Sequence, residues 1–204
     1  MKLILAPHAD DEALGCGGLL ARFADDAAVA VLSDKDDGRM EEFLKAKENL
    51  GYRDHYTTGF TTGTLAARQR ELVGWLDTLI RDLRPTEMYI PSPDAHPDHA
   101  TSYAAGIQAA RKSYTTKGWF VPTVMLYSVP SYSAELYSIP YAFTRYVTLS
   151  EGHLDLKLAA IQAYESQNDG MFDPGILAVD HARFVGAQAN LPAAELYAVI
   201  REIQ

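Results

Sequence analysis

The sequence predicts an α/β fold with a mostly parallel central sheet that helices cover on both faces. Short runs rich in apolar and β-branched residues alternate with stretches of helical periodicity along the chain. The content of these runs suits strands that are buried inside a sheet. Strands that follow one another in parallel need crossover connections, which we expect to be right-handed.

Six segments have the composition of strands. They are Lys2–Pro7, Ala27–Ser33, Asp54–Thr58, Thr86–Pro91, Pro122–Val129 and Phe143–Leu149. Helical periodicity fills the intervals between them and continues after the last. The expected helices are Glu12–Ala24, Met40–Leu50, Leu65–Leu83, His99–Lys112, Gly152–Tyr164 and Ile176–Gln188. The final segment, Glu195–Ile203, fits either a short strand or a last helix, and the tyrosine-rich stretch Tyr127–Tyr146 is expected to form a long loop.

Length, composition and charge indicate the number of domains, the kinds of partner and the location of the protein. The 204 residues fit one domain over 1–204, and 48% apolar content is enough for a core. The net charge of −9 and the absence of a basic run argue against a nucleic-acid partner or an anionic membrane surface. A single cysteine, no signal sequence and no span of about 20 apolar residues together predict a cytoplasmic location. The sequence leaves a homo-oligomer open.

Two polar segments follow two of the predicted strands. Pro7-His8-Ala9-Asp10-Asp11-Glu12 follows the first, and Pro93-Asp94-Ala95-His96-Pro97-Asp98-His99 follows the fourth. Both turns are expected at the carboxyl edge of one sheet, where ligands bind in open α/β folds. Histidine and carboxylate are the ligands of catalytic zinc, which takes three of them and leaves one position open for water. The two segments together therefore predict a divalent metal site.

Each segment also has a simpler interpretation. Asp10, Asp11 and Glu12 are residues that cap a helix and offset its macrodipole. The second segment can be a polar loop in which Asp98 caps the next helix. Finding both after predicted strands, each with ligand types that complement the other, favours the metal site. Cys16 lies between glycines and is expected to pack a helix closely against the sheet.

The two segments carry a resemblance to a known family. Pro7-His8-Ala9-Asp10-Asp11-Glu12 with His96-Pro97-Asp98-His99 resembles the paired signature of the LmbE-like, or PIG-L, family of zinc-dependent N-deacetylases. Further likeness lies in Gly38-Arg39-Met40-Glu41-Glu42 and in residues 182–188. The resemblance implies a single LmbE-like deacetylase domain with a Rossmann-like three-layer sandwich. Ala9 departs from the proline that is usual in the family, but no ligand is lost.

Residue roles follow from the resemblance position by position. His8, Asp11 and His99 are the implied ligands of Zn²⁺, with another divalent ion such as Fe²⁺ as an alternative. Asp10 is the implied general base. His96 is implied to stabilise the oxyanion or protonate the leaving amine, with Asp98 beside it as an orienting carboxylate, and Arg39 is implied to contact the substrate.

The implied reaction removes the N-acetyl group from an N-acetylglucosamine-type amino sugar or its conjugate by means of a metal-activated water. Two other functions use the same residue types. A metal-dependent phosphoesterase commonly needs two bridged ions, whereas we count ligands for one. A non-catalytic metal- or sugar-binding module would not need Asp10, His96 or Asp98, none of which is required to hold zinc. The sequence does not identify the aglycone.

Overall fold

A single seven-stranded sheet forms the centre of the computed structural model, which describes residues 1–35, 38–111, 118–129, 141–168 and 173–203. The strand order is β3-β2-β1-β4-β5-β7-β6. The strands are β1 (Lys2–Ala6), β2 (Ala27–Val31), β3 (Asp54–Thr57), β4 (Glu87–Pro91), β5 (Thr123–Tyr127), β6 (Phe143–Leu149) and β7 (Ala193–Arg201). Strands β1 to β5 pair in parallel, and β7 pairs antiparallel with both β5 and β6. The mostly parallel sheet predicted from the sequence is confirmed.

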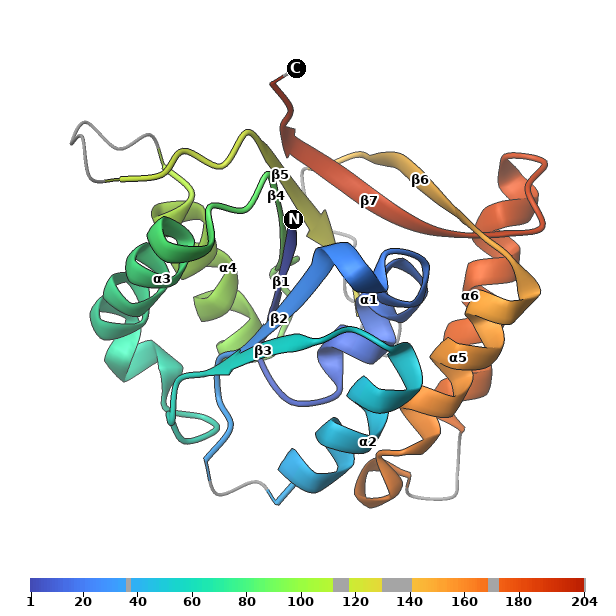
Figure 1. Cartoon of the computed structure of the whole chain (residues 1–204), viewed down its shortest axis with the longest axis horizontal. Helices are drawn as coiled ribbons and strands as arrows, with labels where there is room; N and C mark the ends of the chain where they lie inside the picture. Colours follow the sequence, from blue (N-terminus) through green and yellow to red (C-terminus); the bar gives the residue numbers. More distant parts are fainter. Residues whose placement is uncertain (36–37, 112–117, 130–140, 169–172, 204) are drawn as a thin grey trace.

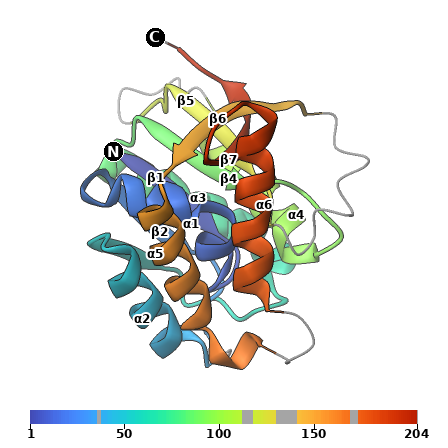
Figure 2. The same cartoon turned by 90° about the vertical axis from the view of Figure 1, so that its right-hand side faces the viewer.

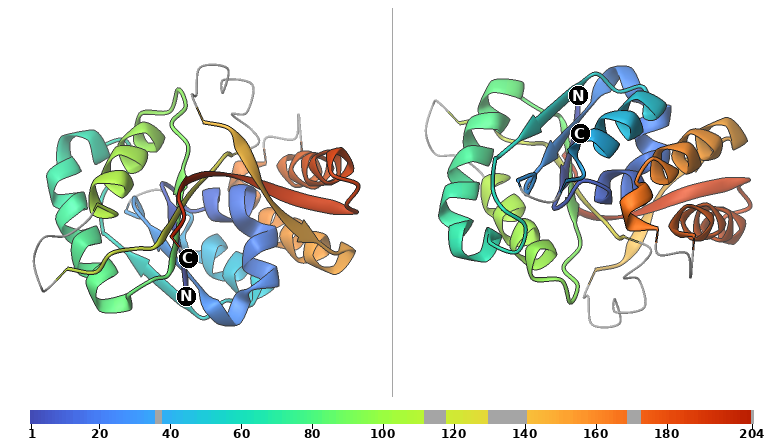
Figure 3. Two further views of the ribbon diagram at one scale, coloured as in Figure 1. Left: turned by 90° about the horizontal axis from the view of Figure 1, so that it is seen from above. Right: turned by 90° about the horizontal axis from the view of Figure 1, so that it is seen from below.

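Helices cover both faces of this sheet (Figure 1). On one face lie α3 (Gln69–Leu83), preceded by the short η2 (Leu65–Arg68), and α4 (Pro97–Ala109). On the other lie α1 (Asp11–Arg22), α2 (Met40–Leu50), α5 (Glu151–Gln162) and α6 (Pro174–Gln188), with the short η1 (Ala24–Asp26) after α1 and η4 (Glu165–Gln167) after α5. Figure 2 shows α2, α5 and α6 in front of the sheet, and Figure 3 shows the sheet between the two helical layers. The arrangement is the predicted three-layer sandwich.

Each face of the sheet has its own apolar core. Ile4 and Val29 point toward α1 and α2, where Leu19 and Phe43 pack against them. The intervening residue Leu3 points to the other face, toward α3 and α4. The leucine stripe of the predicted helix 65–83 supplies this second core, with the following members buried: Leu65, Leu72, Leu76, Leu79 and Ile80.

Helix α1 lies unusually close to its neighbours because its centre is rich in glycine. A Cβ atom at Gly15 would lie 2.3 Å from Cδ2 of Tyr127, and one at Gly18 would lie 2.4 Å from Cδ1 of Leu149. Either contact would force atoms apart, so larger residues do not fit at these positions. Cys16 between them is fully buried, which confirms its expected packing role.

Many helix and strand ends differ from expectation by one to three residues, and three segments differ in a way that has a clear explanation or a structural consequence. The predicted helix from His99 begins at Pro97, because His96 serves as its N-cap and Pro97 takes the first turn, where a missing N–H costs nothing. The final segment Glu195–Ile203, for which the sequence fitted either a strand or a helix, belongs to strand β7. Of the predicted loop Tyr127–Tyr146, residues 130–140 lie outside the described residues, and β6 begins at Phe143. Within the described parts of the chain, no helix has the length and apolar character needed to cross a membrane.

Candidate metal centre and active site

Strands β1 and β4 are neighbours in the sheet, so the two polar segments that follow them lie at the same edge. This point, where β2 lies on one side and β4 on the other side of β1, is the topological switch point of the sheet and the usual ligand site of such folds. The Pro7 carbonyl accepts bonds from the Ser33 N–H at 3.0 Å and the Ser33 hydroxyl at 2.7 Å, which fixes the first turn. The predicted meeting of the two segments is confirmed.

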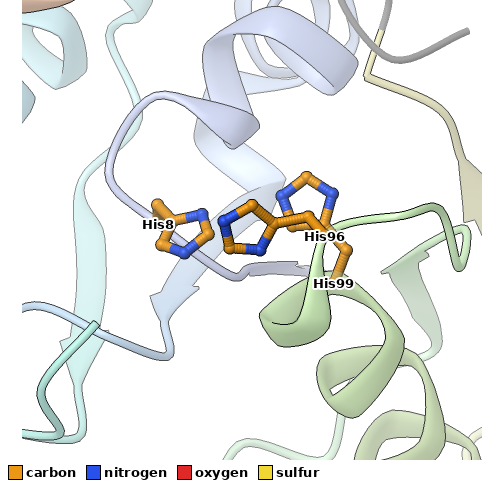
Figure 4. Close-up of side chains that lie close together, drawn as sticks. All are labelled: His8, His96 and His99. Carbon is orange, nitrogen blue, oxygen red and sulfur yellow. The ribbon is translucent and has the colours of Figure 1, made fainter. Parts of the chain in front are cut away.

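Three imidazoles gather at this edge (Figure 4). One potential ligand nitrogen from each of His8, His96 and His99 lies within 4.8 Å of the others. His8 comes from the turn after β1, His96 is the N-cap of α4, and His99 lies in the first turn of α4. His8 is 5% exposed and His99 is 1% exposed, so both rings are nearly withdrawn from solvent.

Asp11 connects two of these rings. Its Oδ2 lies 3.1 Å from Nδ1 of His8 and 3.3 Å from Nε2 of His99, and it also accepts a bond from the His8 backbone N–H at 3.0 Å. Ligand atoms that share one tetrahedral zinc ion, with bonds of about 2.0–2.2 Å, are separated by roughly 3.3 Å. The spacing of these three side chains, and their mixture of imidazole and carboxylate donors, therefore fits a divalent ion.

Each of the two rings has a second carboxylate on its far side. Nδ1 of His99 lies 2.6 Å from Oδ2 of Asp94, and Nε2 of His8 lies 3.2 Å from Oδ2 of Asp98. When a neutral ring donates its N–H to such a carboxylate, the opposite nitrogen keeps a lone pair directed at Asp11. Carboxylates behind ligating histidines are the common arrangement in metal sites, because they fix the tautomer and the orientation of the ring.

The electrostatics of the site agree with this geometry. Burial lowers the pKa of His99, but the carboxylates of Asp11 and Asp94 outweigh it and raise that pKa to about 10. Burial opposes ionisation of Asp11, yet the two histidines hold its pKa well below the usual range. The site thus stabilises positive charge next to Asp11, which is the environment that a bound cation requires.

His96 has a different environment from the other two rings. Its pKa is lowered by burial and then by the charges of His8 and His99. The family resemblance implies that the Asp98 carboxylate orients His96, and the charge of Asp98 does raise the pKa of His96, though by less than these causes lower it. In the structure, Oδ2 of Asp98 contacts Nε2 of His8 and accepts the Gly63 N–H at 2.7 Å, while the Asp98 backbone N–H donates to Nδ1 of His96 at 3.2 Å.

Asp10 lies beside the three proposed ligands with a strained backbone. Its φ of 136° is rare for a residue other than glycine. The Asp10 N–H donates to Oε2 of Glu12 at 3.0 Å, and Nη1 of Arg39 donates to Oδ2 of Asp10 at 2.8 Å. Strain of this kind persists where surrounding contacts over-determine the backbone, as in active sites. Burial and the charge of Asp11 raise the pKa of Asp10, which Arg39 opposes.

A cavity of about 320 Å³ opens at these side chains. Its walls include His8, Asp10, Asp11, Arg39, His96 and His99. Asp98 is not among its lining residues, since its side chain is buried behind His8. The volume lies within the range of small-molecule sites. All of the sequence-predicted site residues therefore meet in one place, with Asp98 behind the cavity wall.

The remaining walls come from residues that we did not single out in the sequence. Thr62 enters from the loop after β3, and its hydroxyl is buried without a hydrogen-bond partner among the described residues. Tyr164 enters from the end of α5, and its hydroxyl donates to Oε1 of Glu12 at 2.5 Å. Neither residue belongs to a local motif. Asp94 had a weak signal, because it lies in the second polar segment, two residues before His96.

Comparison with known proteins agrees with these observations. Residues 3–110, slightly more than half of the chain, match the model of the family described as PIG-L, GlcNAc-PI de-N-acetylase. An uncharacterized deacetylase, YaiS, from Escherichia coli (strain K12) is 26% identical over 179 residues, covering 80% of this chain and 90% of YaiS. The diacetylchitobiose deacetylase of Thermococcus kodakarensis is 27% identical over 188 residues, covering 81% of this chain and 69% of that protein.

A solved structure has a similar fold. The conserved protein TT1542 from Thermus thermophilus is similar with a TM-score of 0.81 and 26% identity, covering 100% of this chain and 95% of that one. The matched family region contains both polar segments and every side chain of the proposed metal site. This chain therefore belongs to the PIG-L, or LmbE-like, family, whose relatives include deacetylases.

Proposed function

We propose that the protein is a metal-dependent hydrolase that removes the N-acetyl group from an N-acetylglucosamine-type amino sugar or its conjugate. The observation that carries this proposal is the contact of Asp11 with both His8 and His99, beside Asp10 and in one cavity. The deacetylase relatives support the reaction class. Diacetylchitobiose, the substrate named for one of them, supports the amino sugar.

His8, Asp11 and His99 would hold the ion, which we propose to be Zn²⁺ or another divalent ion such as Fe²⁺. When bound, it would supply a Lewis acid for the amide carbonyl and a water of lowered pKa. Asp94 and Asp98 would keep the two imidazoles in the tautomers that ligation needs. The rest of the catalytic work falls to side chains that do not ligate.

Asp10 would act as general base, since it lines the cavity next to the proposed ligand Asp11 without being needed to hold the ion. Arg39 would keep the Asp10 carboxylate in place through its 2.8 Å bond, and its position in the cavity wall also supports the substrate contact that the family resemblance implies. A positioned general base typically contributes about 10²- to 10⁴-fold to rate.

His96 would stabilise the oxyanion that forms when water attacks the acetyl carbon. Its ring lies in the cavity wall beside those of His8 and His99, with centroids 4.7 Å and 4.9 Å away. A preorganised donor at such a position is commonly worth about 3–4 kcal/mol. A proton must then reach the leaving nitrogen, and either Asp10, once protonated, or His96 would deliver it.

The two rival functions are less well supported. A two-ion phosphoesterase needs ligands for a second ion, and within the described part of the chain the histidine cluster is the one group of suitable ligands. A non-catalytic binding module gives no reason for the strained Asp10 backbone beside the ligands.

Acetate release from N-acetyl amino sugars by the metal-loaded protein tests the proposal. We expect Asp10→Asn to retain one ion per chain but to lose at least about 100-fold in turnover. His99→Ala should lose the ion itself. Asp155→Asn, which removes an exposed carboxylate from the middle of α5, is the control and should leave both unchanged. Failure to release acetate from any member of a broad panel would contradict the proposed reaction.

A further inference from the structure

A second cavity of about 490 Å³ adjoins the proposed active site. Three residues, Ile161, Tyr164 and Pro174, line both cavities. They lie at or just after the end of α5 and at the start of α6. A substrate whose acetamido group lies at the histidine cluster can therefore extend its non-reacting part past these three residues.

The walls between the two cavities are held by hydrogen bonds. The Tyr164 hydroxyl donates to Glu12 at 2.5 Å, and Glu12 in turn accepts the Asp10 N–H. Ser166, two residues further on, donates its N–H and its hydroxyl to the two carboxylate oxygens of Glu42 at 2.9 Å and 2.6 Å. Tyr164, which lines both cavities, is therefore hydrogen-bonded to the glutamate that also contacts Asp10.

The second cavity is acidic. Its described lining includes two acidic residues, Glu165 and Asp173, and two residues with amide side chains, Gln162 and Asn168, and it includes neither lysine nor arginine. The first cavity has one arginine in its described lining, Arg39, which is already paired with Asp10. Amide groups can donate to and accept from sugar hydroxyls. A phosphate, by contrast, would meet two carboxylates and no uncommitted cation of the described lining, within a chain of net charge −9.

We infer that the second cavity is the aglycone subsite and that it takes an uncharged or cationic glycosyl group rather than a phosphate-bearing one. The inference rests on the proposed function, and it deepens that function by naming the substrate class. The inference also distinguishes the substrate of this chain from the one in its family's description, because that phosphatidylinositol glycoside carries a negatively charged phosphate.

The test compares kcat/KM for acetate release from three substrates at fixed ionic strength. They are an N-acetylglucosamine joined to a second neutral sugar, N-acetylglucosamine 1-phosphate, and a nucleotide-diphosphate-linked N-acetylglucosamine. We expect the neutral disaccharide to be preferred by about tenfold or more over both anions. Equal or better use of either anionic substrate would overturn the inference and leave the deacetylase function standing. No acetate from any of the three would refute the function and the inference with it.

A double variant tests whether the preference for the neutral substrate arises in the second cavity. Glu165→Gln combined with Asp173→Asn removes both charges, and asparagine can still cap α6 as Asp173 does through its bonds to the Gly175 and Ile176 N–H groups. The preference for the neutral substrate should fall at least about threefold, because the like-charge repulsion is removed. Glu165→Gln alone, on an exposed side chain, should shift the ratio in the same direction if the double variant folds poorly.

The matched control is Glu151→Gln with Asp155→Asn in the first half of α5, which changes the net charge by the same amount. This control should leave the substrate ratio unchanged. Equal shifts in the two double variants would show a general charge effect and would overturn the assignment of the subsite.

Discussion

Replacing Lys157 by methionine should remove a large part of the stability of the fold. Lys157 is 2% exposed, and its ammonium group lies 2.6 Å from Oε1 of Glu195 and 2.8 Å from the Leu14 carbonyl. Glu195 is also buried, and it accepts the Gly18 and Leu19 N–H groups at 2.8 Å and 2.7 Å. This ion pair joins α1, which carries Asp11, to α5 and β7.

The cost of the substitution follows from the charge that it leaves behind. Without Lys157, the Glu195 carboxylate stays buried with no cation, and removing one partner of a buried pair typically costs about 3–5 kcal/mol. The Leu14 carbonyl also loses its bond from the ammonium group, so we expect a value inside that range rather than below it. Adding Glu195→Gln should recover only part of this loss, because the amide is neutral but has a single oxygen for the two N–H groups of Gly18 and Leu19.

Urea unfolding followed by circular dichroism measures these free energies. Lys45→Met on the exposed face of α2 is the control and should change the free energy of unfolding by no more than about 0.5 kcal/mol. A loss below about 1 kcal/mol in Lys157→Met would refute the reasoning, since it would mean that Glu195 does not depend on this cation.

Three further predictions concern the site and its surroundings. Asp94→Ala should weaken zinc binding by about 10- to 100-fold, because His99 loses the carboxylate that orients its ring; competition with a chelator measures this, and unchanged affinity would contradict it. Thr62 lines the cavity, and its hydroxyl has no partner among the described residues, so we expect it to bond the substrate. Thr62→Val should therefore lower kcat/KM by about fivefold, the value of one hydrogen bond, whereas Thr62→Ser should retain activity. Thr64→Val is the control, because the Thr64 hydroxyl donates to the Thr61 carbonyl instead. His181→Asn should reduce the loss of stability between pH 7.5 and pH 5.5. Burial, and then the charge of Lys157, lower the pKa of His181 in the folded chain; the unfolded chain, with a pKa of about 6.5, therefore binds the proton first, and wild-type stability falls as the pH drops through that value. An identical pH dependence of the unfolding free energy in the two proteins would count against this explanation.

Much of the fold could be predicted because its signals are local. The segments Met40–Leu50 and Phe143–Leu149 have the predicted bounds. The final strand could not be assigned because Ala193–Arg201 lies between β5 and β6 and is buried along most of its length, so it lacks the period-two alternation of a half-exposed strand. Its antiparallel direction depends on its neighbours in the sheet, which no local pattern encodes.

The site likewise contains some residues that local sequence signals indicate and others that they do not. The convergence of His8, Asp11 and His99 could be predicted because they follow two strands that end at one edge, and short motifs carry them. Tyr164 could not, because it reaches the cavity from a segment more than 150 residues away from Asp11 in the sequence. Asp98 was expected beside His96, yet its carboxylate lies behind His8, since the first turn of α4 directs it toward the loop at Gly63.

The central claim is that one aspartate and two histidines, rather than all three histidines, hold a single ion. An anomalous difference map from a zinc-soaked crystal tests it most directly. We predict one peak, at about 2.0–2.2 Å from Nδ1 of His8, Nε2 of His99 and a carboxylate oxygen of Asp11, with Asp10 outside bonding distance. A peak bonded to His96 in place of Asp11, or no peak at this edge of the sheet, would contradict the account.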